Sequence, residues 1–77
     1  MNIALTPVAN STQIEASGYD DASQTLAVRF KSSRATYNYE GVPPDVAAAF
    51  NVAESPGKFF SATVRGQYEH TKVVDED

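Results

Sequence analysis

Two adjacent prolines, Pro43 and Pro44, separate two kinds of sequence pattern in this chain of 77 residues. Proline has no backbone N–H, so neither residue can continue a central strand of a sheet. Pro44 followed by Asp45 suits the first turn of a helix, because a missing N–H is harmless there and a carboxylate meets the positive end of the helix dipole. We therefore expect strands before the prolines and helices after them.

The clearest strand pattern runs from Thr25 to Lys31, where large apolar residues alternate with small or charged ones. A period of two places the two kinds on opposite faces of a sheet, so we expect one face in the core and the other in water. The core-facing residues are Leu26, Val28 and Phe30, and the water-facing residues are Ala27, Arg29 and Lys31.

Two weaker strand patterns flank this one. Residues 12–19 carry Ile14, Ala16 and Gly18 at a period of two, which places them on one face. Residues 35–40 follow a short hairpin loop and form the third strand. The first ten residues are weakly patterned, and we expect order to begin after them. Together the patterns predict an antiparallel meander of three strands.

Two helical patterns follow the prolines. The first has one apolar stripe at helical spacing, made of Val46, Ala49, Phe50 and Ala53. Ser55 and Pro56 then suit the N-cap and first residue of a second, short helix, and Gly66 suits a left-handed C-terminal cap. Phe60 and Val64 are spaced to point inward together. We expect both helices to cover the sheet, with Phe50 and Phe30 buried.

The end of the chain is less regular. Residues 68–74 alternate loosely and predict a last strand or an arm closing over the sheet, and Asp75 to Asp77 form a like-charged tail that we expect to be solvated. The length suits a single domain, with an ordered body from about residue 8 to 74. The predicted fold is α+β, a small three-stranded antiparallel meander packed by two short helices.

Composition excludes several functions. The chain has no cysteine, one histidine (His70), and no recognisable nucleophile–base pair, phosphate-binding loop or paired carboxylates. We therefore expect a non-enzymatic protein without catalytic residues, metal ligands or a cofactor. A formal net charge of −4 opposes non-specific nucleic-acid binding. No signal peptide or membrane-spanning segment is recognisable, so we expect a cytoplasmic protein.

Five cations and two tyrosines are the candidate binding residues: Arg29, Lys31, Arg34, Tyr37, Tyr39, Lys58 and Arg65. The first three cations could form a basic strip on the outer face of the sheet, which the other two would extend around the second helix. The two tyrosines share one face of a strand and could stack RNA bases. Packing against a helix is the commoner role for such rings, and we favour it.

Several short segments occur in an order that is typical of one family: Gly18-Tyr19-Asp20, Leu26 with Val28 and Phe30, Tyr37-x-Tyr39, Val42-Pro43, Ala53-x-Ser55-x-Gly57 and Arg65-Gly66-x-Tyr68. Across residues 8–68 the chain resembles the KTSC domain, which occurs at the C-terminus of some lysyl-tRNA synthetases and in small stand-alone proteins of bacteria and phages. The resemblance implies an RNA-associated role as one option. Pro56 stands where this family commonly has a basic residue, which weakens that inference.

Two function classes remain. The first is a protein-interaction adaptor or inhibitor of bacterial or phage origin, whose outer sheet or C-terminal arm docks on a larger protein partner. The second is an RNA-associated accessory module that uses the basic strip with Tyr37 and Tyr39. The negative net charge of the chain, and Pro56 in place of a basic residue, favour the first class.

Overall fold

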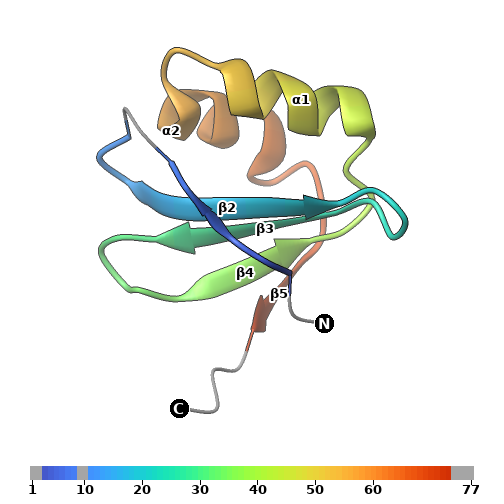
Figure 1. Ribbon diagram of the computed structural model, residues 1–77, viewed down its shortest axis with the longest axis horizontal. Coiled ribbons are helices and arrows are strands. Elements are labelled where there is room, and N and C mark those ends of the chain that lie inside the picture. Colours follow the sequence, from blue (N-terminus) through green and yellow to red (C-terminus); the bar gives the residue numbers. More distant parts are fainter. Residues whose placement is uncertain (1–2, 9–10, 74–77) are drawn as a thin grey trace.

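A five-stranded antiparallel sheet carries one layer of helices on one face, as the computed structural model shows for residues 3–8 and 11–73 (Figure 1). The strands follow chain order, β1-β2-β3-β4-β5. The elements are β1 (Thr6–Pro7), β2 (Ile14–Asp20), β3 (Thr25–Phe30), β4 (Thr36–Tyr39), α1 (Pro44–Val52), α2 (Pro56–Phe59), the π-helical segment η1 (Phe60–Val64) and β5 (His70–Val73).

The predicted meander of β2, β3 and β4 is confirmed, and the sheet is larger than the three strands predicted. One short strand is added at each edge of the meander. The weakly patterned N-terminus supplies β1, which pairs with β2, and the expected C-terminal strand or arm is β5, which pairs with β4. The predicted acidic tail, Asp75–Asp77, lies outside the described residues.

The helix-facing side of the sheet contains the core. Leu26 and Val28 of β3 are buried and belong to one cluster with Ile14, Phe50 and Phe60. Phe50 is 1% exposed, as expected, whereas Phe30 at the end of β3 is only half-buried and packs at the margin of the cluster. The candidate functional site lies at this margin.

A β-bulge changes the facing of β2. Ile14 pairs with Phe30, but Ala16 pairs with Arg29, so Glu15 is an extra residue in the ladder. Beyond the bulge Ser17 pairs with Val28 and shares its helix-facing side, while Ala16 and Gly18 lie on the other face. The prediction that Ile14, Ala16 and Gly18 share one face is therefore wrong.

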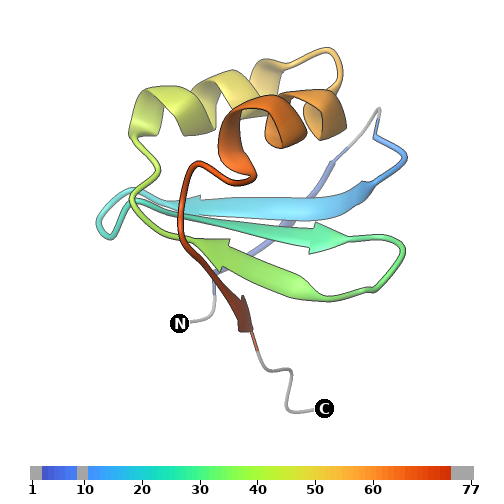
Figure 2. The same cartoon turned by 180° about the vertical axis from the view of Figure 1, so that it is seen from behind.

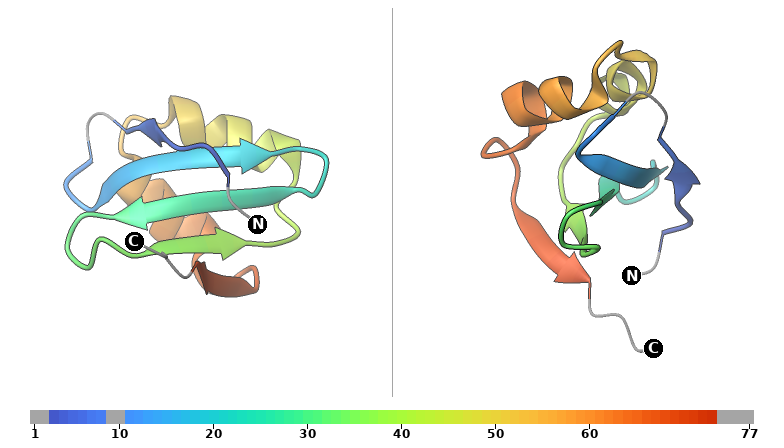
Figure 3. Two further views of the ribbon diagram at one scale, coloured as in Figure 1. Left: turned by 60° about the horizontal axis from the view of Figure 1, so that its bottom comes forward. Right: turned by 90° about the vertical axis from the view of Figure 1, so that its left-hand side faces the viewer.

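The outer face of the sheet is partly covered rather than fully exposed to water. Ala27 is 1% exposed and Thr25 is 5% exposed on this face. The N-terminal segment, residues 3–8, crosses β2 on the side away from the helices (Figure 3, left). A side chain at Gly18 would overlap the carbonyl oxygen of Ala4, which shows how closely the segment approaches. The expected water-facing surface is thus wrong at Ala27.

The helical layer begins and ends as its sequence signals predict. Pro44 is the first residue of α1, and Ser55 and Pro56 begin α2, although Ser55 makes no side-chain capping bond. α2 continues directly into η1, and both lie over the same side of the sheet as α1 (Figure 2). Within the layer, the ring of Phe50 lies 6.3 Å from that of Phe59. In α1, Ala47 and Phe50 are buried, while the other stripe residues are half-buried.

The position of the N-terminal segment over β2 can be tested by a substitution at Gly18. Gly18→Ala should displace residues 3–8, because the added Cβ would overlap backbone and would also lie 3.0 Å from Cγ2 of Ile3. The Val8 N–H, which donates to Glu15 O over 3.0 Å, should then lose its protection in hydrogen–deuterium exchange.

A chain lacking residues 1–7 provides the matched background. There, Gly18→Ala should have little further effect on the free energy of unfolding, because nothing remains for the new methyl group to displace. Full protection of the Val8 amide in the full-length Gly18→Ala variant would show that the segment does not lie over Gly18.

Candidate functional site

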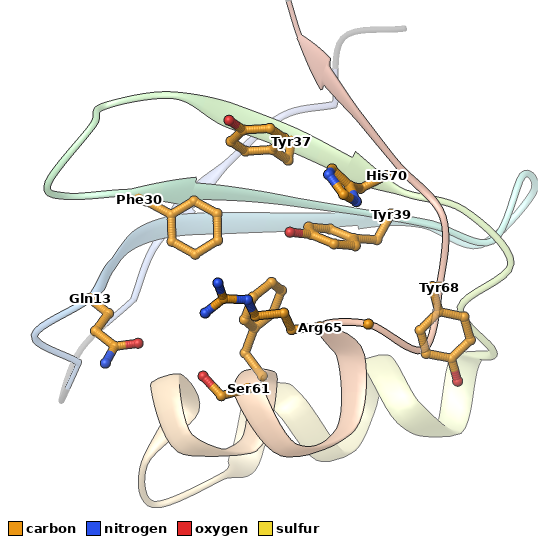
Figure 4. A pocket seen from close by; sticks show the side chains of 10 residues that line it. Gln13, Phe30, Tyr37, Tyr39, Ser61, Arg65, Tyr68 and His70 are labelled. Carbon is orange, nitrogen blue, oxygen red and sulfur yellow. The ribbon is translucent and has the colours of Figure 1, made fainter.

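An open groove lies where the helical layer stops short of the β4–β5 end of the sheet. Its volume is about 560 Å³. We call it the aromatic groove, and define it by the residues that line it: Gln13, Phe30, Tyr37, Tyr39, Phe60, Ser61, Arg65, Gly66, Tyr68 and His70 (Figure 4). The volume is in the range of ligand-binding clefts, which are typically about 300–1,000 Å³.

The register of β4 directs its two tyrosines into the groove. Tyr39 pairs with Leu26 and Tyr37 pairs with Val28, and cross-strand partners share a face. Because Leu26 and Val28 belong to the core, both rings lie on the helix-facing side. Tyr39 is 5% exposed, whereas Tyr37, one pair further along the sheet, is half-buried.

The rings of the groove form a connected cluster. Phe60 of η1 contacts Tyr39 with ring centroids 5.1 Å apart, and Phe30 with centroids 5.4 Å apart, both edge-to-face. Phe30 also meets Tyr37 at 5.9 Å. Such edge-to-face pairs are favourable beyond the area that they bury. The cluster gives the groove a rigid apolar floor.

His70 lies in this cluster. The sequence predicted a last strand or an arm for residues 68–74, and His70 belongs to a strand. It occupies the first position of β5, paired with Tyr39. Its imidazole ring centroid lies 5.4 Å from that of Tyr39 and 5.6 Å from that of Tyr37. His70 is nevertheless exposed, so its other side faces the groove opening.

A tight turn after η1 places Arg65. The Arg65 N–H donates to Phe60 O over 2.8 Å, which completes the π-helical turn. Gln67 N–H then donates to Val64 O over 3.1 Å, with Arg65 at φ −64°, ψ 125° and Gly66 at φ 82°. These values describe a type II turn, which needs a glycine at its third position. The predicted left-handed role of Gly66 is confirmed.

The electrostatics of the groove are set by one guanidinium. Figure 4 shows the Arg65 side chain extending from the end of the helix toward the rings of Phe30 and Tyr39. Burial raises the pKa of the Tyr39 hydroxyl above its ordinary value, Arg65 opposes that rise, and Tyr37 adds to it. Among the residues that the structure describes, no aspartate or glutamate lines the groove. Within the described part of the chain, no carboxylate is within ion-pair distance of Arg65.

The structure does not join the other predicted cations to Arg65. Arg29 lies on the outer face of the sheet, 3.9 Å from the carboxylate of Glu15. Lys31 Nζ donates to Ser11 O over 2.8 Å. Arg34 lies in the β3–β4 loop with φ 57°, and Lys58 is exposed on α2. The expected strip is therefore divided between the two faces of the sheet.

The groove residues that sequence reasoning missed come from three elements, β3, η1 and β5, and from the segments before β2 and before β5. Phe30 and Phe60 were predicted as core, and Gln13, Ser61, Tyr68 and His70 had no assigned role. The pairing of β5 with β4 would have been the signal for His70, because it places His70 beside Tyr39. That pairing is long-range, and the loose alternation of residues 68–74 hints at it only weakly.

The groove contains no assembled catalytic or metal-binding group. No hydrogen bond joins Ser61 to His70, so these residues do not form a nucleophile–base pair. Across residues 3–8 and 11–73, no three histidine, aspartate or glutamate side chains gather as metal ligands would. In the same part of the chain, no helix has the length and apolarity needed to cross a bilayer.

Comparison with known proteins identifies relatives across most of the chain. The KTSC domain family model matches residues 10–68. A protein from Tsukamurella paurometabola is 47% identical over 58 residues, which cover 75% of this chain and 85% of that protein. A protein from Stutzerimonas stutzeri is 41% identical over 65 residues, which cover 84% and 90% of the two chains.

A solved structure shares the architecture. The crystal structure of a KTSC domain protein from Yersinia pestis matches with a TM-score of 0.88 and 32% sequence identity. The match covers 95% of this chain and 100% of that one. The sheet and helical layer described above are therefore common to both proteins.

The raised pKa of Tyr39 predicts a loss of stability in alkali. The folded protein holds the phenolic proton of Tyr39 to higher pH than the unfolded chain does, because in the unfolded chain the pKa of tyrosine is 10.0. The resulting stabilisation is complete below about pH 10 and is lost as the pH rises through the folded pKa. Tyr39→Phe should therefore lose less unfolding free energy between about pH 8 and pH 11 than the wild type, as measured by urea unfolding.

Tyr19 provides the second arm of this experiment. Burial raises its pKa as well, with smaller contributions from Asp21, Asp20 and Asp45, and its hydroxyl donates to Val42 O over 2.5 Å. The Tyr19→Phe/Tyr39→Phe double variant should show the smallest alkaline loss. An alkaline loss in the double variant equal to that of the wild type would contradict both assignments.

Proposed function

The chain belongs to the KTSC domain family, as its motifs predicted, and from that premise we propose that it is a non-enzymatic protein-interaction module. Its binding surface is the aromatic groove, which holds a segment of a partner protein. It acts as an adaptor or inhibitor in the bacterial cytoplasm, with a bacterial or phage gene as its source.

The single observation that carries this proposal is the ring cluster left open at one end of the helical layer. Aromatic side chains are enriched at protein interfaces, because they supply large contact areas with little loss of side-chain freedom. Elsewhere among the described residues, the exposed large hydrophobic side chain is Val52, at 82%. Three of the five half-buried aromatic residues, Phe30, Tyr37 and Tyr68, line the groove, and the other two, Tyr19 and Phe59, lie outside it.

The alternative is an RNA-associated accessory module that uses the basic strip with Tyr37 and Tyr39. Stacking requires open ring faces, and Tyr39 is 5% exposed with Phe60 and His70 against it. The cations that would follow one phosphate backbone lie on both faces of the sheet. Both observations favour the protein partner over RNA.

Blocking the groove tests the proposal. Ser61 is exposed on η1 at the edge of the groove, so Ser61→Glu should fill part of the opening without disturbing the core. Immobilised wild-type protein would capture partners from a lysate of the source bacterium, and the affinity of each purified partner would then be measured by calorimetry. We expect Ser61→Glu to weaken the binding of a true partner at least about tenfold.

Ser32→Glu is the matched control. It makes the same chemical change on the exposed β3–β4 loop, outside the groove, and should leave the affinity unchanged. A partner that binds Ser61→Glu as tightly as the wild type would show that the groove is not the binding surface. Recovery of RNA instead of protein, with micromolar affinity at physiological salt, would favour the alternative.

A further inference from the structure

We propose that the aromatic groove recognises a carboxylate, and that its occupant is a peptide segment in which this carboxylate stands beside an apolar or aromatic side chain. The inference rests on the proposed function and specifies the chemistry of the partner. It is carried by the polar groups of the groove, which differ from those of an ordinary hydrophobic docking surface.

The polar side chains that line the groove, within residues 3–8 and 11–73, supply hydrogen-bond donors but no anionic acceptor. Arg65 offers a planar fork of N–H donors, and the hydroxyls of Tyr39 and Ser61 add two more. Neither hydroxyl makes a hydrogen bond in the described part of the protein. An incoming carboxylate could accept from these groups without displacing an existing partner.

Figure 4 shows that these donors converge. The guanidinium of Arg65 and the hydroxyl of Tyr39 are directed at the same space beside the ring of Phe30. The turn that places Arg65 is held by two backbone hydrogen bonds, Arg65 N–H to Phe60 O and Gln67 N–H to Val64 O. A preorganised backbone lowers the cost of ordering the side chain on binding.

The contrast with Arg29 shows what Arg65 lacks. Arg29 has Glu15 at 3.9 Å on the outer face, whereas Arg65 has no carboxylate partner among residues 3–8 and 11–73. Arg65 is also exposed, so a ligand can reach it. A guanidinium binds a carboxylate through two parallel hydrogen bonds, which are stronger and more directional than a neutral contact.

A carboxylate suits the groove better than a phosphate backbone does. Among the described residues that line the groove, Arg65 is the only lysine or arginine, which matches a single negative charge. The chain carries a net charge of −4, which repels a polyanion more than a peptide with one acidic group. The rings of Phe30 and Tyr37, both half-buried, offer an apolar neighbour for the side chain next to the carboxylate.

Four short peptides test the inference and separate two sources of a carboxylate. Acetyl-Gly-Phe-Glu-Phe-Gly-amide carries it on a side chain, and acetyl-Gly-Phe-Phe carries it at a free C-terminus. Their neutral counterparts are acetyl-Gly-Phe-Gln-Phe-Gly-amide, in which glutamine replaces the glutamate, and acetyl-Gly-Phe-Phe-amide, in which an amide replaces the free C-terminus. Binding would be followed by NMR titration of the ¹⁵N-labelled full chain, with the amides of Ser61, Gly66 and His70 as reporters. We expect at least one acidic peptide to bind about tenfold more tightly than its neutral counterpart.

Arg65→Gln should abolish that preference, so that each acidic peptide binds this variant no more tightly than its neutral counterpart does. Arg34→Gln, which removes an exposed cation from the β3–β4 loop, is the matched control and should keep the preference. The ratio of the affinities for an acidic peptide and its neutral counterpart is informative even if Arg65→Gln lowers the stability of the protein, because both peptides are measured on the same folded variant.

The outcomes distinguish this inference from the proposed function. Equal binding of acidic and neutral peptides in the groove would overturn carboxylate recognition and leave the protein-interaction module standing. Shifts at the groove amides with uridine monophosphate that exceed those with every peptide would overturn both and support the RNA alternative. Retention of the acidic preference in Arg65→Gln would show that another residue recognises the carboxylate.

Discussion

The packing of Phe60 against the β4 end of the sheet is the contact on which both the core and the groove depend. Phe60 is 2% exposed and lies edge-to-face against Tyr39 and Phe30. It joins the end of the helical layer to the sheet, because η1 makes its π-helical turn at this point. On the side of Phe60 away from the core, the side chains of Tyr37 and His70 line an open groove. One ring therefore completes the hydrophobic core on one side and forms the floor of a binding surface on the other.

The sequence predicted those parts of the fold that local residues determine. The prolines that start each helix, Gly66 after η1, and the burial of Phe60 and Val64 were all predicted correctly. The two edge strands could not be predicted with the same clarity. β1 and β5 have little apolar alternation, and what holds them is backbone pairing with β2 and β4, which depends on residues distant in the sequence. No residue type in the sequence marks the bulge at Glu15, yet the bulge exchanges the faces on which the side chains of the rest of β2 lie.

Of the candidate binding residues, Tyr37, Tyr39 and Arg65 meet in the groove and the others do not. Sequence reasoning could place the two tyrosines on one face of a strand, because that follows from a period of two. It could not decide whether the helices would cover that face completely, since this depends on where the second helix ends relative to the sheet. The same limit applies to Arg65: its direction follows from a π-helical turn and a type II turn, and the path of the backbone through both is a tertiary property. A binding surface at the margin of a core can therefore be recognised only when the position of the helices on the sheet is known.

A double-mutant cycle between Phe60 and Tyr39 tests this account most directly. Phe60→Leu, Tyr39→Leu and the double variant would be unfolded with urea alongside the wild type, and the interaction energy would be obtained from the four unfolding free energies. Because the rings lie 5.1 Å apart at an interplanar angle of 81°, we expect a favourable coupling of about 0.5–1.5 kcal/mol. Additive losses, with a coupling below about 0.3 kcal/mol, would mean that Phe60 does not hold the helical layer to this end of the sheet, and the groove would lose its structural basis.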